Sequence, residues 1–140
     1  MVQIIVGKKG KGKTKYLLDK VNEDVQKSSG SIVYLDKSTK HMFELNNKIR
    51  LINVKDYLVE SADGFLGFIC GIISQDHDLE RMYLDSFLTL ACVNEPAAVS
   101  GIVKDLHKIS DNFKVDFVIS VSLDESELPE EIKSNVIISL

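Results

Sequence analysis

Residues 7–14 read GKKGKGKT and directly follow the apolar run VQIIV at Val2–Val6. The stretch matches the pattern G-x-x-x-x-G-K-S/T, in which glycines let successive backbone N–H groups turn toward one anion. Residues 13–27 then place apolar side chains on one side at helical spacing. A buried strand, this loop and an amphipathic helix together predict a phosphate-binding loop, with the positive end of the helix dipole at the anion.

Each side chain in this loop has an expected role in binding a nucleotide. We expect Lys13 to reach the outer phosphates and Thr14 to offer its hydroxyl to a magnesium ion. Lys8, Lys9 and Lys11 add positive charge that suits a polyphosphate, although solvation of an exposed loop explains them equally well. The predicted ligands are therefore ATP, or another nucleoside triphosphate, and Mg²⁺. The predicted phosphate-binding residues are Gly7, Lys8, Lys9, Gly10, Lys11, Gly12, Lys13 and Thr14.

Length and composition predict a single domain spanning residues 1–140. The chain is 44% hydrophobic and 27% charged, close to the globular average. Its formal net charge of −4 argues against a broad basic face for nucleic acid. The N-terminus has no secretory signal pattern, and the apolar segment 64–73 is shorter than the ~20 residues that span a bilayer. We therefore expect a cytoplasmic protein without a membrane span.

Strands and helices are predicted to alternate from end to end, which is typical of a parallel sheet covered on both faces. We expect an α/β fold with three α/β/α layers and a mainly parallel sheet of five or six strands. In the helix predicted at 61–75, Gly64, Gly67 and Gly71 lie along one side, where we expect close approach to a sheet or helix. The remaining predicted strands are 31–35, 49–53, 81–85, 114–122 and 135–140, the remaining helix is 97–110, and 124–134 is a short acidic helix or loop.

A magnesium-dependent phosphate loop also needs a carboxylate at the end of a neighbouring strand. Asp36, Asp85 and Asp124 each end a predicted strand. The order of elements resembles the RecA-like (ASCE-type) core of the P-loop NTPase superfamily, in which the fourth such element carries the Walker B aspartate. This resemblance selects Asp85, which would hold Mg²⁺ through water. It also implies that the strand 114–122 lies between the P-loop strand and the Walker B strand.

The resemblance to RecA-like ATPases further implies that Ser120 and Ser122 act as polar sensors near the γ-phosphate. Those ATPases carry a catalytic glutamate after the Walker B aspartate or near the end of the second strand. Here these places hold Ser86 and Asp36. Asp36 is then the acid available to orient water, so the predicted catalytic residues are Lys13, Asp85 and Asp36. Hydrolysis is expected to be slow, or to be completed by a partner.

A second resemblance concerns the loop itself. Lys8 occupies the position of the signature lysine in the loops of the MinD and ParA family, G-K-G-G-x-G-K-T, which work across a dimer interface. Lys9 replaces one of that family's glycines, so the match is partial. A homodimer or another protein partner stays open on this basis.

These features favour an ATP-binding protein with weak, magnesium-dependent ATPase activity that acts as a switch or as a subunit of an assembly. A small-molecule kinase and a non-hydrolysing nucleotide-binding module are the alternatives. Kinases usually bring several arginines on a lid, whereas this chain has Arg50 and Arg81. His41, His77 and His107 are scattered along the chain and are expected to be solvated or capping residues.

Overall fold

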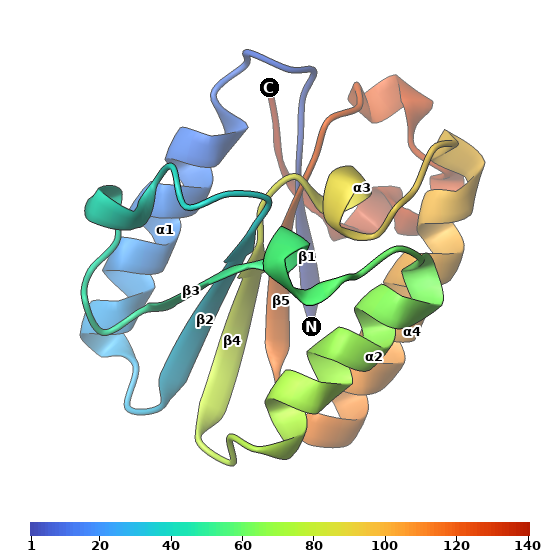
Figure 1. The fold of residues 1–140 in the computed structure, drawn as a ribbon. Coiled ribbons are helices and arrows are strands. Elements are labelled where there is room, and N and C mark those ends of the chain that lie inside the picture. The colour runs from blue at the N-terminus through green and yellow to red at the C-terminus, as the bar shows by residue number, and fades with distance from the viewer.

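Six parallel strands form the central sheet of the protein (Figure 1). The computed structural model describes residues 1–140. The strands are β1 (Val2–Val6), β2 (Ser31–Asp36), β3 (Arg50–Asn53), β4 (Leu79–Leu84), β5 (Asp116–Val121) and β6 (Val136–Ser139). Their order across the sheet is β3-β2-β4-β5-β1-β6, and every neighbouring pair is parallel. As predicted, β5 lies between β1 and β4.

Helices cover both faces of this sheet, which gives the three predicted layers (Figure 1). The α-helices are α1 (Lys13–Lys27), α2 (Ala62–Ser74), α3 (Phe87–Leu90) and α4 (Val99–Phe113). Helix α1 packs on one face, and α2 and α4 pack on the other. The short helix α3 was not predicted from the sequence. Short 3-10 helices occupy connections at η1 (Met42–Glu44), η2 (Val54–Tyr57), η3 (Pro96–Ala98), η4 (Glu125–Glu127) and η5 (Glu130–Asn135).

The strands bury apolar side chains on both faces of the sheet. Ile5, Tyr34 and Tyr83 pack with α1, whereas the neighbouring Ile4 and Leu35 belong to the core under α2 and α4. A strand covered on both sides needs apolar residues at every position, so it reads as a continuous apolar run. This is why the central strands were recognisable in the sequence. No helix is long and apolar enough to cross a membrane.

The glycines of α2 face solvent, so the prediction that they form a close-packed stripe was wrong. Gly64, Gly67 and Gly71 are exposed, whereas Phe65 and Ile69 on the other side of the helix are fully buried. A Cβ atom at Gly67 or Gly71 would meet no atom within 4 Å. The helix turns its large apolar side chains toward the sheet because they remove more apolar surface from water than glycines do.

All six strands end at the same edge of the sheet, where the loop after β1 also lies (Figure 1). Asp36 is the last residue of β2, and Asp85 directly follows β4. In open parallel sheets the crevice beyond the carboxyl ends of the strands is the usual place for a ligand. The fold therefore gathers the loop and both aspartates at one edge.

Candidate functional site

The loop between β1 and α1 has the backbone of an anion cradle. Gly10 and Gly12 have φ angles of 82° and 93°, in the left-handed region that favours glycine. Gly12 is also the N-cap residue of α1, and no side chain caps this helix. The first N–H groups of α1 are therefore left for an external acceptor, at the positive end of the helix dipole.

Lys13 is buried at the base of this loop. Its residue surface is only 7% exposed, and its Nζ donates to the backbone carbonyl of Lys8 at 3.1 Å. Burial lowers the pKa of the Lys13 ammonium, a shift that the charge of Asp85 opposes and the charge of Lys9 reinforces. Lys13 forms no ion pair with a carboxylate. A buried ammonium that forms no ion pair is well placed to bind an anion.

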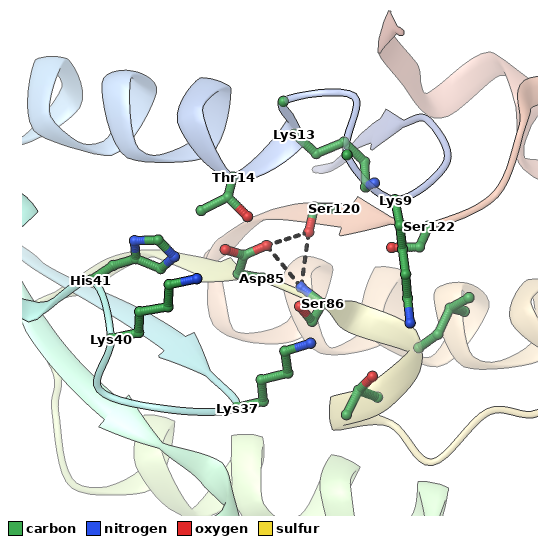
Figure 2. Close-up of a pocket in the computed structure, with 14 residues that line it drawn as sticks. Lys9, Lys13, Thr14, Lys37, Lys40, His41, Asp85, Ser86, Ser120 and Ser122 are labelled. Carbon is green, nitrogen blue, oxygen red and sulfur yellow. Dashed lines mark hydrogen bonds between the residues drawn. The ribbon is translucent and has the colours of Figure 1, made fainter.

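Asp85 faces the loop and accepts hydrogen bonds from three donors, two of which, on Ser120 and Ser86, are drawn in Figure 2. The Ser120 hydroxyl and the Ser86 backbone N–H donate to Oδ1 at 2.7 and 2.9 Å. The Tyr34 hydroxyl donates to Oδ2 at 2.9 Å. Burial and the charge of Asp85 raise the pKa of Tyr34, which keeps its phenol protonated. The carboxylate is thus fixed in orientation by β2, β5 and the turn after β4.

The turn after β4 has an unusual backbone that supports this network. Ser86 has φ 56° and ψ 49°, a left-handed conformation that costs about 1–3 kcal/mol for a residue other than glycine. In this conformation its N–H also contacts the Ser120 hydroxyl at 2.9 Å. The strain is offset by the hydrogen bonds that the Ser86 N–H donates to the buried Asp85 carboxylate and to the Ser120 hydroxyl, and such strain is concentrated at functional sites.

One cavity of about 620 Å³ joins these parts (Figure 2). Its walls come from the loop after β1, the start of α1, the loop after β2, the turn after β4 with α3, and the end of β5 with the residue after it. All but one of its lining residues are polar, charged or glycine. The lining residues are Lys9, Gly10, Gly12, Lys13, Thr14, Lys37, Lys40, His41, Asp85, Ser86, Leu88, Thr89, Ser120 and Ser122.

Most of the residues predicted from the sequence meet in this cavity, but not all. The exceptions in the loop are Gly7, Lys8 and Lys11, which do not line it. Asp124 is also outside: it caps η4 and forms a capping box with Glu127. The structure therefore places Asp85, and not Asp124, in the cavity that Lys13 and Thr14 line.

Asp36 lies beside the cavity and does not form part of its wall. The Lys37 backbone N–H donates to its Oδ1 at 2.7 Å, while its Oδ2 is buried without a partner. Burial raises the pKa of the Asp36 carboxyl against the effect of the Lys37 hydrogen bond, and the charge of Asp85 adds to the rise. Its role in orienting water stays a prediction.

Six lining residues were not predicted as site residues from the sequence: Ser86, Leu88 and Thr89 after β4, and Lys37, Lys40 and His41 from the loop after β2. Lys37, Lys40 and His41 line the cavity opposite the phosphate loop, and the His41 ring also contacts Glu44 at 3.0 Å. The sequence offered one indication of their role, since these residues belong to the loop that follows a strand ending in an aspartate. Strand order was needed to show that this end lies next to β4.

Similarity to known proteins is found at the level of structure. No protein-family model and no curated protein sequence matches the chain. The crystal structure of flagellar accessory protein FlaH from Methanocaldococcus jannaschii is similar, with a TM-score of 0.56 and 16% sequence identity. The match covers 95% of this chain and 65% of the FlaH chain. This chain therefore spans less than two thirds of the length of FlaH. At this identity the likeness shows the fold alone, an α/β fold with a parallel sheet.

Proposed function

We propose that this protein binds ATP, or another nucleoside triphosphate, together with Mg²⁺ at the loop 7–14 and hydrolyses it slowly, as a switch or as a subunit of an assembly. The observation that carries the proposal is the buried Lys13, which has no acidic partner and lies in a glycine-rich loop at the start of a helix. Phosphates would supply the missing negative charge and accept hydrogen bonds from the free N–H groups.

The side chains opposite Lys13 fit a magnesium ion that accompanies a nucleotide. The Thr14 hydroxyl points toward Asp85 across the cavity (Figure 2). Mg²⁺ prefers oxygen ligands and keeps several waters, so it is usually held by one or two protein groups plus substrate phosphates. Thr14 would bind the ion directly, and Asp85 would hold it through water. The ion would neutralise phosphate charge between the β- and γ-positions.

The absence of a second acid in the cavity wall supports slow hydrolysis. Asp85 is the sole carboxylate among the lining residues, and both of its oxygens already accept hydrogen bonds. Asp36 lies behind the wall. No lining carboxylate is therefore free to take a proton from attacking water, the task that an acid or a water-positioning residue performs in fast NTPases.

The arginines give no support to a small-molecule kinase. Arg50 pairs with Asp76 at 3.4 Å, and Arg81 pairs with Asp24 at 2.9 Å, and neither arginine lines the cavity. The non-hydrolysing module is favoured by the same absence of a free acid that supports slow hydrolysis. Phosphate release measured with and without candidate acceptors separates these activities.

The variant Lys13→Ala tests nucleotide binding. The control is Lys20→Ala, which removes one positive charge from the same helix. Calorimetric titration with Mg-ATP should show affinity about tenfold weaker, or more, for Lys13→Ala, because a charge-assisted hydrogen bond contributes about 1.5–3 kcal/mol. Lys20→Ala should bind like the parent. Equal binding by Lys13→Ala and the parent would refute the proposal.

The magnesium site has its own test. Asp85→Asn should abolish the dependence of nucleotide binding on Mg²⁺, whereas Asp124→Asn should retain it, because Asp124 lies outside the cavity. Far-UV circular dichroism checks that both variants are folded. The opposite pattern would show that Asp124 holds the ion.

A further inference from the structure

The loop after β2 forms the wall of the cavity that faces the phosphate loop. Strand β2 pairs with β4 so that Leu35 lies beside Leu84, and the Asp85 backbone N–H donates to the Leu35 carbonyl at 2.9 Å. This pairing places the residues after Asp36 next to the turn that carries Asp85. Figure 2 shows the ammonium groups of Lys37 and Lys40 directed from this loop toward Ser86 and Asp85.

The far end of the same loop is tied to α1, the helix that begins in the phosphate loop. The Asn22 side chain donates to the Glu44 carbonyl at 2.8 Å, and its oxygen accepts from the Asn46 N–H at 2.8 Å. Both ends of the loop are thus attached to elements that carry other parts of the site. Attachment at both ends holds the backbone of Lys37 and Lys40 at a defined distance from the loop 7–14.

The lysines of the cavity lack acidic partners. Lys9, Lys13, Lys37 and Lys40 all line it, and none forms an ion pair. The one carboxylate of the wall, Asp85, accepts its hydrogen bonds from a tyrosine, a serine and a backbone N–H instead. Four ammonium groups therefore face one carboxylate, an excess of positive charge that suits a polyanion.

We propose that Lys37 and Lys40 bind the terminal phosphate of a nucleoside triphosphate and so make the site select triphosphate over diphosphate. This inference rests on the proposed function. The N–H groups of the loop 7–14 would contact the inner phosphates, which both ligands carry, and Lys13 would reach the outer phosphates, of which the diphosphate keeps the β-phosphate. Lys37 and Lys40 line the wall opposite this loop, and their ammonium groups point toward Ser86 and Asp85. The terminal phosphate would extend from the loop toward this wall, with Mg²⁺ bridging it to the β-phosphate. A diphosphate has no group at that position.

The selection would come from side chains that are free in the absence of ligand. Lys37 and Lys40 are exposed, so their ammonium groups are hydrated and their stems flexible until a phosphate binds. Each would then form a charge-assisted hydrogen bond to the terminal phosphate. Loss of both lysines should weaken binding of the triphosphate and leave binding of the diphosphate unchanged.

The experiment compares Mg²⁺ complexes of ADP and of a non-hydrolysable ATP analogue by calorimetric titration. The variants are Lys37→Ala, Lys40→Ala and the double variant, with Lys48→Ala as the matched control. Lys48 is an exposed lysine in the same connection between β2 and β3 that does not line the cavity. We expect the double variant to bind the triphosphate about tenfold more weakly and ADP like the parent. Lys48→Ala should keep the parent's ratio of affinities.

An unchanged ratio in the double variant, or an equal loss for both nucleotides, would overturn the inference. That result differs from a failure of the proposed function, which would show as no nucleotide binding by the parent or as full binding by Lys13→Ala. Because the replaced lysines are exposed and unpaired, thermal unfolding of the double variant should match the parent and confirm that it is folded.

Discussion

Replacing Tyr34 with phenylalanine removes one hydroxyl from a fully buried position and tests how Asp85 is held. The hydroxyl is 2.9 Å from Asp85 Oδ2, and no other donor in the protein serves that oxygen. The ring would stay in place against Tyr83, with which it stacks at a centroid distance of 6.4 Å and an interplanar angle of 10°. The substitution therefore changes one hydrogen bond with little change in packing.

The expected cost follows from leaving a buried carboxylate oxygen without a donor. Hydrogen bonds to charged groups contribute about 1.5–3 kcal/mol. For a chain of this size, a loss of 1 kcal/mol lowers the thermal midpoint by roughly 4 °C. Tyr34→Phe should therefore lower the free energy of unfolding by about 1.5–3 kcal/mol and the thermal midpoint by roughly 6–12 °C.

The matched control is Tyr83→Phe, the same chemical change at the residue paired with Tyr34 across the two strands. The Tyr83 hydroxyl is buried and has no hydrogen-bond partner, so its removal should be neutral or slightly stabilising. Urea unfolding of the parent and both variants measures the two free energies. Equal effects of the two substitutions, or a neutral Tyr34→Phe, would refute the assignment of Tyr34 as the donor that holds Asp85.

Two further predictions concern stability. Gly67→Ala should raise the free energy of unfolding by about 1 kcal/mol in urea, because alanine favours a helix and its Cβ meets open space; a loss would show that the exposed glycine is needed. Asp36→Asn should become more stable than the parent as pH rises. In the folded parent the pKa of Asp36 is raised above its ordinary value of 3.8. The parent therefore loses stability as pH rises from about 3.8 to the raised pKa, where the unfolded chain has already released this proton. Urea unfolding from pH 3 to pH 7 checks this, and a stability difference independent of pH would contradict it.

Local patterns were enough to predict several elements with the observed bounds. Val2–Val6 and Lys13–Lys27 agree with β1 and α1 because a bounded apolar run and a helical repeat are each recorded in neighbouring residues. The helix α3 was missed because it has only four residues and follows a left-handed Ser86. Such a short segment shows no periodicity, and a positive φ at serine has no sequence signature.

The error in α2 has a different physical cause. Helical spacing shows that Gly64, Gly67 and Gly71 share one side, but it does not say which way that side faces. Burial of Phe65 and Ile69 decided the orientation, and the glycines were turned outward. Which side of a helix faces the sheet depends on how all the elements compete for burial. The sequence of one segment does not contain that information.

The sequence by itself determined the glycine-rich loop at residues 7–14, its strand and helix, and the α/β class, because each depends on residues close together in the chain. Only the tertiary structure decided that Tyr34, Ser120 and the loop carrying Lys37 and Lys40 meet Asp85. These residues come from strands whose lateral order is set by helix crossovers and by packing of both faces. A site built across such strands is a property of the assembled sheet, and no single segment of the sequence records it.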